Sequence, residues 1–307
     1  MKWLSADDLV TLAPHRALVD ALRDGFRADI TTPVRHHHDP LSTTTLLLMP
    51  AWSKDWTGLK TVTVKTDNAA QGLPTVQGTY LLIDNATGAP AALMDGTELT
   101  RRRTAAASAL AADYLARPDA ETLVIVGAGA LAPHFLQAHA SVRPIKKVII
   151  CARSPEKTAG LVKVIESLGF QGHVTSDIEN AVREADIVSC VTSSTEALVK
   201  GAWLKPGTHV VLAGAFKPAM RETDGDVVAR ASVYVDTREG ALAEAGDLIQ
   251  AKAEGKFDFT SVQGDLFELC RGTVAGRKSP DEITLFKSCG TALEDLAAAV
   301  MVHLRSA

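Results

Sequence analysis

An apolar run that stops at a glycine turn limits the possible folds of this chain more than any other part of its sequence. The run covers residues 123–127, and Gly129 and Ala132 follow within the string "GAGALA". A stretch with helical spacing comes next, and a second apolar run ends at Cys151. This order predicts a strand, a tight turn, a helix and a second strand, which together form a βαβ unit with parallel strands.

The same alternation continues beyond this unit. Short apolar runs are separated by stretches with helical spacing, such as "SPEKTAGLVKVIESLG". Strands that alternate with helices are typical of a parallel sheet covered by helices. We therefore predict an α/β fold with a Rossmann-type, doubly wound parallel sheet. Its predicted strands are 123–127, 147–151, 186–192, 208–213 and 232–236.

The residues before about 112 follow a mixed pattern of short strands and helices. Their expected elements are a helical segment over 5–26, strands over 43–52 and 58–66, a hairpin over 79–95, and an alanine-rich helix over 99–116 that Pro118 ends. The residues 279–307 are expected to form one long helix that returns to this first part of the chain. The sequence thus predicts a smaller α/β domain beside the Rossmann-type domain.

Composition and charge exclude several classes of protein. The net charge is −4 and the isoelectric point is about 6.1, so no basic field for nucleic acid or for a membrane surface is expected. No apolar run approaches the roughly 20 residues that cross a bilayer. The four cysteines lie far apart, which predicts neither a disulfide framework nor a zinc site, and a cytoplasmic location is expected. The run His36–His37–His38 cannot direct all three rings at one ion, so we expect exposed loop histidines and no metal.

The string "GAGALA" fits the pattern GxGxxG/A of dinucleotide-binding turns. Gly127 allows the tight turn, Gly129 lets the backbone approach a pyrophosphate, and Ala132 permits close packing of helix on strand. We predict that Gly127, Gly129, Ala130 and Leu131 bind the cofactor. The alternative is a strand–helix turn without a ligand, and the surrounding βαβ pattern argues against it.

The end of the second strand indicates which dinucleotide is bound. A site for NAD places an acid there to accept hydrogen bonds from the ribose 2′-hydroxyl, but the string "CARSPEK" has no acid before Glu156. Arg153, Ser154 and Lys157 instead offer donors to a 2′-phosphate. We predict NADPH as the cofactor, with NADH as the alternative. Arg153 and Lys157 could also be solvated charges without a ligand.

Basic residues of the first domain indicate a site for a small carboxylate. Lys60 lies in an apolar strand pattern, where a cation is costly unless it meets an anion. Arg35 and Arg103 could converge with it, and two arginines with a lysine would bind a carboxylate strongly. Thr75 in "GLPT" is a further candidate, as a residue that holds a water molecule. Arg101 and Arg102 are expected to be surface charges.

These residues resemble the ornithine cyclodeaminase/mu-crystallin family over nearly the whole chain. The matching strings are "GLK", "GLPT", "LTRRRTAAAS", "VGAGALA", "TSSTEALV", "GAFKPAMRETD" and "ITLFKSCGTALEDLAAA". The resemblance implies that Arg35, Lys60 and Arg103 hold a substrate carboxylate, with Gly290 nearby. It also implies that Thr104, Thr192, Ser193 and Ser194 lie along the dinucleotide.

The resemblance further implies the domain organisation. A Rossmann domain that binds NADP, over 113–289, would be inserted into a substrate-binding and dimerisation domain formed by 1–112 and 290–307. The protein is accordingly expected to be a homodimer with a small-molecule imino acid as its substrate.

One departure from the family pattern bears on the reaction. Cyclodeaminases carry an aspartate where this chain has Phe216, and a phenyl ring can neither take a proton nor hold an ammonium group by charge. Members with a non-acidic residue here resemble ketimine reductases, which reduce Δ1-pyrroline-2-carboxylate or Δ1-piperideine-2-carboxylate. The chain is thus expected to transfer hydride from NADPH to a protonated cyclic imine, with Lys60 or a water molecule on Thr75 as proton donor.

The resemblance also allows other interpretations of the function. The same residues would suit an acyclic imine reductase or an amino-acid dehydrogenase, acting on alanine or iminosuccinate. A residual ornithine cyclodeaminase and a non-catalytic NADPH-binding protein like mu-crystallin are the further alternatives.

Overall fold

The computed structural model describes the backbone of residues 1–307 and the side chains of all of them except 69, 157 and 159. Its contacts divide the chain into two compact units. Unit 1 is formed by Met1–Thr104 together with Thr291–Ala307, and unit 2 by Ala105–Gly290. The boundary at Thr104 falls within helix α3 (Gly96–Leu115). No helix among the described residues is long and apolar enough to cross a membrane.

Unit 1 is built on a six-stranded sheet with the order β1-β6-β5-β4-β3-β2. All neighbours are antiparallel except β1, which runs parallel to β6. The predicted strands and the hairpin are confirmed, because period-2 patterns with one buried face are strong local signals. The strand bounds are β1 (Lys2–Leu4), β2 (His36–Leu41), β3 (Thr44–Trp52), β4 (Trp56–Lys65), β5 (Val76–Asp84) and β6 (Pro90–Asp95).

The edge strand β2 corrects one expectation. His36, His37 and His38 lie in this strand and not in a loop, although all three are exposed. Every residue of β2 is exposed, so its sequence has no apolar alternation that could have revealed a strand.

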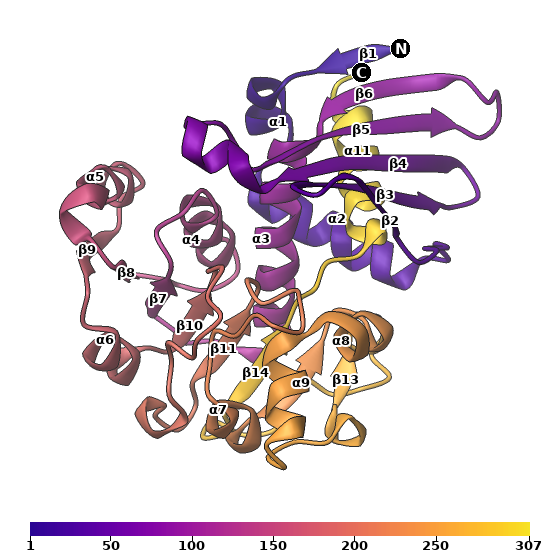
Figure 1. Cartoon of the computed structure of the whole chain (residues 1–307). Coiled ribbons are helices and arrows are strands. Elements are labelled where there is room, and N and C mark those ends of the chain that lie inside the picture. The colour runs from indigo at the N-terminus through magenta and orange to yellow at the C-terminus, as the bar shows by residue number, and fades with distance from the viewer. The chain divides into compact units, whose positions relative to one another are not determined.

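Three α-helices lie entirely within unit 1, in addition to the first part of α3. They are α1 (Ala6–Leu12), α2 (His15–Arg27) and α11 (Ala292–Arg305), and a 3-10 turn η1 (Thr66–Gln71) follows β4. The single helical segment expected at the N-terminus is divided into α1 and α2 because Pro14 disfavours helical geometry at Ala13. Helix α11 packs against β3, β4 and β5, and α2 packs on α11 (Figure 1).

The long C-terminal helix expected over 279–307 is wrong in its first half. Strand β14 (Thr284–Lys287) comes first and belongs to unit 2. Gly290 has a φ of 80°, and Thr291 then caps α11 by accepting a hydrogen bond from the backbone N–H of Leu293. The β-branched and aromatic residues of "ITLF" favour a strand, and the glycine prevents a continuous helix.

Unit 2 contains an eight-stranded parallel sheet with the order β13-β12-β14-β11-β10-β7-β8-β9. The doubly wound sheet that the sequence predicts is therefore present, and strands β9, β13 and β14 were not expected. The strand bounds are β7 (Thr122–Val126), β8 (Lys147–Cys151), β9 (Gln171–Thr175), β10 (Ile187–Cys190), β11 (His209–Leu212), β12 (Ser232–Val235) and β13 (Gly264–Asp265). The α-helices are α4 (Ala132–Ala140), α5 (Ala159–Ser167), α6 (Ile178–Glu184), α7 (Gly225–Arg230), α8 (Arg238–Glu244), α9 (Gly246–Ala253) and α10 (Leu266–Arg271). The 3-10 turns are η2 (Pro155–Thr158), η3 (Gly201–Trp203) and η4 (Phe259–Ser261).

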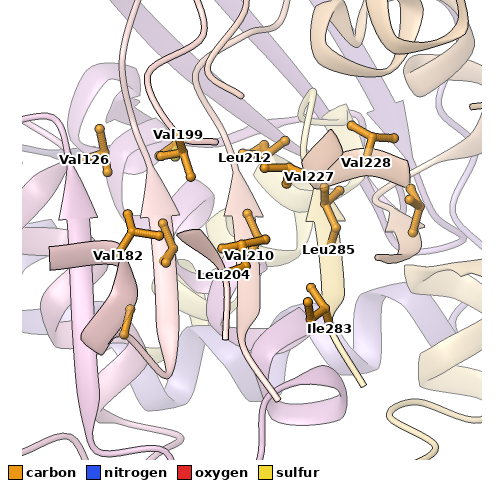
Figure 2. Packing of buried hydrophobic residues seen from close by; sticks show 14 of the residues in the cluster. Val126, Val182, Val199, Leu204, Val210, Leu212, Val227, Val228, Ile283 and Leu285 are labelled. Carbon is orange, nitrogen blue, oxygen red and sulfur yellow. The ribbon is translucent and has the colours of Figure 1, made fainter. Parts of the chain in front are cut away.

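An aliphatic core holds the parallel strands of unit 2 in place. Figure 2 shows side chains of β7, β11 and β14, such as Val126, Val210 and Leu285, beside Val182 of α6 and Val227 of α7. The central strands are buried on both faces, which explains their unbroken apolar runs. Strands β8 and β9 extend the sheet on one side of β7, whereas β10 lies on its other side. The carboxyl ends of β7 and β10 therefore mark the switch point at which such sheets bind ligands.

Candidate functional site

The glycine turn after β7 has the geometry that a dinucleotide needs. Gly127 has a φ of 119°, and a Cβ there would lie 2.9 Å from the carbonyl oxygen of Val191. A Cβ on Gly129 would meet no atom within 4 Å, so the backbone is open to a close approach from outside. Helix α4 begins at Ala132, which is fully buried, and the positive end of the helix dipole faces the turn. These features fit the pyrophosphate of a dinucleotide.

The other residues expected to bind the cofactor lie at neighbouring strand ends of unit 2. Ala130 is exposed and Leu131 precedes the first turn of α4. Arg153 is exposed and Ser154 half-buried in the segment that follows β8. The side chain of Lys157 lies outside the described residues.

Two further loops carry sequence-predicted residues of unit 2. After β10, Thr192 and Ser194 are half-buried and Ser193 is exposed. Phe216 lies in the loop after β11 with 45% of its surface exposed. Gly290, at the end of the unit, donates its N–H to Oδ2 of Asp236 at 2.5 Å.

A buried polar cluster that the sequence did not predict lies next to these loops. It consists of Glu222, Asp247 and Lys287. All three side chains are almost completely buried. Nζ of Lys287 lies 3.3 Å from Oδ2 of Asp247. Burial raises the pKa of Glu222, and the charge of Lys287 opposes that rise. The only local signal was a lysine at the end of the apolar run "ITLFK".

A second buried cluster lies in unit 1, on the sheet face that α11 covers. Lys60 points into this face from β4 and is only 2% exposed. Its Nζ lies 2.7 Å from Oδ2 of Asp295. Arg103 of α3 places Nε 3.0 Å from Oδ1 of the same aspartate and Nη1 2.5 Å from Oε2 of Glu294. Asp295 therefore bridges the two cations that the sequence assigns to a substrate carboxylate.

The electrostatics of this cluster make Lys60 unusual. Burial lowers the pKa of Lys60 to about 8, with the charge of Arg103 acting in the same direction and Asp295 against it. Burial also acts to lower the pKa of Arg103, but Asp295 and Glu294 outweigh it, so that pKa lies above its usual value. Burial and then Asp295 raise the pKa of Tyr80 well above its usual value, and its hydroxyl has no hydrogen-bond partner among the described residues.

The remaining sequence-predicted residues of unit 1 differ in their relation to Lys60. Arg35 is half-buried, and its charge contributes to the lowered pKa of Lys60. Thr75 is half-buried in a loop that Asn68 holds by donating to the carbonyl of Pro74 at 2.8 Å. Thr104 is half-buried on α3. The structure thus brings Lys60 and Arg103 together around Asp295, with Arg35 close enough to act on the charge of Lys60.

The expectation that Arg102 is a surface charge is wrong. It is 5% exposed, and its guanidinium donates to Oε1 of Glu98 at 2.8 Å and to the carbonyl of Ala13 at 2.9 Å. Arg102 therefore satisfies the C-terminal end of α1, a long-range contact that no local pattern shows. Arg101 is half-exposed, 3.6 Å from Glu98.

Sequence reasoning missed the acids of α11. The cost of burying Lys60 indicated an anion, which was expected to be the substrate, but Asp295 of the chain itself lies there. The signal that could have found it is the adjacent pair Glu294–Asp295 in the otherwise apolar string "TALEDLAAAV". Two charges in such a helix need buried partners. Among the described residues, no group of His, Cys, Asp and Glu is arranged to hold a metal ion.

Comparisons with known proteins place nearly the whole chain in one family. The model of the ornithine cyclodeaminase/mu-crystallin family matches residues 9–307. The Δ1-pyrroline-2-carboxylate reductase of Paracoccus denitrificans is 41% identical over 97% of this chain and 95% of its own. The Δ1-pyrroline-2-carboxylate reductase of Thermococcus litoralis, solved with NADH and L-proline, has a TM-score of 0.94 at 33% identity, covering 100% of this chain and 97% of that one. An archaeal alanine dehydrogenase dimer with bound NAD has a TM-score of 0.93 at 30% identity, covering 100% and 96%.

Proposed function

Because the chain belongs to the ornithine cyclodeaminase/mu-crystallin family, we propose that it is an NADPH-dependent reductase of cyclic 2-imino acids. Its substrates would be Δ1-pyrroline-2-carboxylate, Δ1-piperideine-2-carboxylate or both, and its products L-proline and L-pipecolate. The observation that carries this proposal is the match, along nearly the whole of both chains, to Δ1-pyrroline-2-carboxylate reductases.

The buried cluster of unit 1 supports a role in binding the substrate carboxylate. Lys60 and Arg103 are balanced by Asp295 and Glu294, and Arg35 adds a further positive charge. Asp295 contacts both cations and so fixes their separation. Side chains that are held in one geometry lose little entropy when they bind a ligand, and fixed orientation is a large part of catalysis.

Lys60 is also a better candidate for the proton donor than a water molecule on Thr75. With a pKa of about 8 it is mostly protonated at pH 7, yet it gives up its proton more readily than an ordinary lysine. General acids act best when their pKa lies near the working pH. Thr75 would then hold a water molecule beside the substrate, as the second way to deliver the proton.

NADPH, when bound, supplies the hydride, and the residues of unit 2 would hold it. The open backbone at Gly129 and the start of α4 suit its pyrophosphate. Arg153 and Ser154 offer donors to the 2′-phosphate, whereas a carboxylate at this place would repel it. The solved relatives contain NADH or NAD, so the preference for NADPH rests on these two residues.

Phe216 favours a reductase over a cyclodeaminase. It stands where cyclodeaminases have an aspartate, and its exposed ring offers an apolar wall and no proton acceptor. Such a wall suits a flat cyclic imine better than the ammonium group of ornithine.

We also propose that the protein is a homodimer. On the face of the unit 1 sheet opposite to Lys60, paired positions form a cross-strand row of apolar side chains that are half-buried or exposed. The row consists of Trp3, Leu93, Leu81, Leu59 and Pro50. A continuous apolar face of this kind is typical of a protein interface, and the archaeal alanine dehydrogenase is a dimer.

A substrate panel tests the proposed reaction. The wild-type protein is incubated with NADPH or NADH and with each of the two cyclic imino acids, pyruvate plus ammonia, or oxaloacetate plus ammonia. We expect the fastest oxidation with a cyclic imino acid and a lower KM for NADPH than for NADH. Ornithine is tested separately for ammonia release, and none is expected.

The panel also separates the alternatives. Faster turnover of pyruvate with ammonia would indicate an amino-acid dehydrogenase, like the archaeal alanine dehydrogenase whose structure this chain resembles. Tight dinucleotide binding without turnover of any substrate would indicate a binding protein. Either result contradicts the proposed reductase.

A further inference from the structure

Glu222 joins two loops at the carboxyl edge of the parallel sheet. Its Oε1 accepts hydrogen bonds from the backbone N–H of Thr192 at 2.6 Å and from the hydroxyl of Thr192 at 2.9 Å. Its Oε2 accepts the N–H of Gly214 at 2.8 Å. Thr192 follows β10 and Gly214 follows β11, so one carboxylate holds the ends of two neighbouring strands together.

The backbone of Glu222 is itself fixed by hydrogen bonds. Its backbone N–H donates to Oδ1 of Asp247 at 2.8 Å, and its carbonyl accepts from Leu198 and Val199. Lys287, at the end of β14, pairs with Asp247 inside the same buried cluster. Burial acts to lower the pKa of Lys287, but Asp247, followed by Cys289 and Glu222, outweighs this effect, so that pKa lies above its usual value. A carboxylate fixed in this way has little freedom to follow a loop that moves.

The loop after β10 also lies against the glycine turn of the predicted dinucleotide site. A Cβ on Gly127 would lie 3.1 Å from Cγ2 of Thr192, and one on Gly214 would lie 2.0 Å from the carbonyl oxygen of Thr192. Thr192 is therefore confined between Gly127 on one side and Gly214 on the other. The three loops follow β7, β10 and β11, which are adjacent in the sheet.

We propose that Glu222 is a positioning residue for the dinucleotide, which fixes the loop 192–194 against the Gly127 turn at the switch point of the sheet. This inference rests on the proposed function in one respect, namely that the ligand of unit 2 is a nicotinamide dinucleotide. Glu222 itself is completely buried and acts through Thr192.

Two substitutions test separately the charge of the Glu222 side chain and its length. In Glu222→Gln the single acceptor oxygen can serve only one loop, and the amide NH2 group would face the N–H of the other. In Glu222→Asp the charge remains, but the side chain is one methylene shorter and cannot span both loops. Glu254→Gln is the matched control, because Glu254 is an exposed carboxylate that pairs with Arg221.

The experiment measures Kd for NADPH and NADH by isothermal titration calorimetry, and kcat at saturating dinucleotide. Loss of a buried hydrogen bond to a charged acceptor corresponds to a rise in Kd of about tenfold or more. We expect this rise in both Glu222 variants, with kcat and the KM of the imino acid changed by less than about threefold, because a uniform binding effect leaves the chemical step intact. Glu254→Gln should bind as the wild type does.

Normal dinucleotide binding by folded Glu222→Gln and Glu222→Asp would overturn the inference. Circular dichroism and thermal unfolding show whether the variants fold. If the Glu222 variants do not fold, Thr192→Val and Thr192→Ser are compared instead, since only serine keeps the hydroxyl that donates to Glu222. The inference expects weaker binding in the valine variant and recovery in the serine variant, and equal Kd values would overturn it.

The two proposals fail in different ways. Wild-type protein that binds dinucleotide but reduces no imino acid would contradict the proposed reaction and leave the comparison of Kd values valid. An active reductase whose Glu222 variants bind normally would contradict this inference alone.

Discussion

Lys60 carries a charge inside the protein, and the residues around it determine what that charge can do. Asp295 stabilises the protonated form, whereas burial, Arg103 and Arg35 favour the neutral form. The balance leaves the pKa of Lys60 at about 8, between the values of a histidine and an ordinary lysine. A small change in one neighbour should therefore shift the group across the physiological range.

The pH dependence of the reaction should report this balance. If protonated Lys60 donates the proton, kcat/KM for the imino acid should fall as the pH rises through about 8. Asp295→Asn removes the charge that favours the protonated form, so the pKa of Lys60 should drop and the alkaline fall in kcat/KM should move to lower pH by about one unit or more.

Lys60→Met should lose roughly 10²- to 10⁴-fold in kcat, as expected for the loss of a general acid.

Glu179→Gln serves as the control for Asp295→Asn, because Glu179 is an exposed carboxylate that pairs with Arg183. Its profile should coincide with that of the wild type. An Asp295→Asn profile that is lower at every pH but not displaced would contradict the electrostatic role of Asp295.

At the scale of elements, a buried histidine connects helix α4 to strand β10. Nε2 of His139 lies 2.9 Å from Oγ of Ser189, and the ring is completely buried. Burial, with a smaller effect of Arg143, lowers the pKa of His139 to about 3. The folded protein therefore holds this ring neutral at a pH where the unfolded chain would protonate it.

Acid should destabilise the protein through this contact. Below the unfolded pKa of about 6.5 the unfolded chain binds a proton that the folded chain does not, so stability falls with pH from about 6.5 towards 3. At pH 5 the loss from His139 is about 2 kcal/mol. Urea unfolding at pH 7 and pH 5 should show a smaller loss in His139→Gln than in the wild type. The exposed His173 provides the control, and equal losses in wild type and His139→Gln would contradict the prediction.

At the scale of the whole molecule, the apolar row of the unit 1 sheet should decide the oligomeric state. Leu59 and Leu81 are directly paired at the centre of this row. A lysine at either position would place a charge in an interface that excludes water. We expect sedimentation velocity to show a dimer for the wild type and a monomer for Leu59→Lys or Leu81→Lys.

Gln171→Lys, an exposed position on β9, controls for the added charge. It should remain a dimer. A monomeric wild type, or dimeric lysine variants that retain the wild-type thermal unfolding curve, would contradict the proposed interface.

The local elements of this protein could be predicted from its sequence alone. The βαβ unit, its glycine turn and the antiparallel strands of unit 1 were predictable, because a strand or helix with one buried face repeats its apolar residues at a fixed period. Gly127 was recognisable because a left-handed backbone in a tight turn favours glycine. The cations Lys60 and Arg103 could also be identified as candidate site residues, because charged residues are unusual in the apolar and alanine-rich strings that surround them.

Which polar groups contact one another depends on how the elements pack in the folded protein. Asp295 lies beside Lys60, Glu222 lies between Thr192 and Gly214, and Arg102 is buried against the end of α1. These partners come from distant parts of the chain, and no local period relates them. A buried charge shows in the sequence that it needs a partner, but its identity depends on how the elements pack, because burial and hydrogen bonding are properties of the folded core.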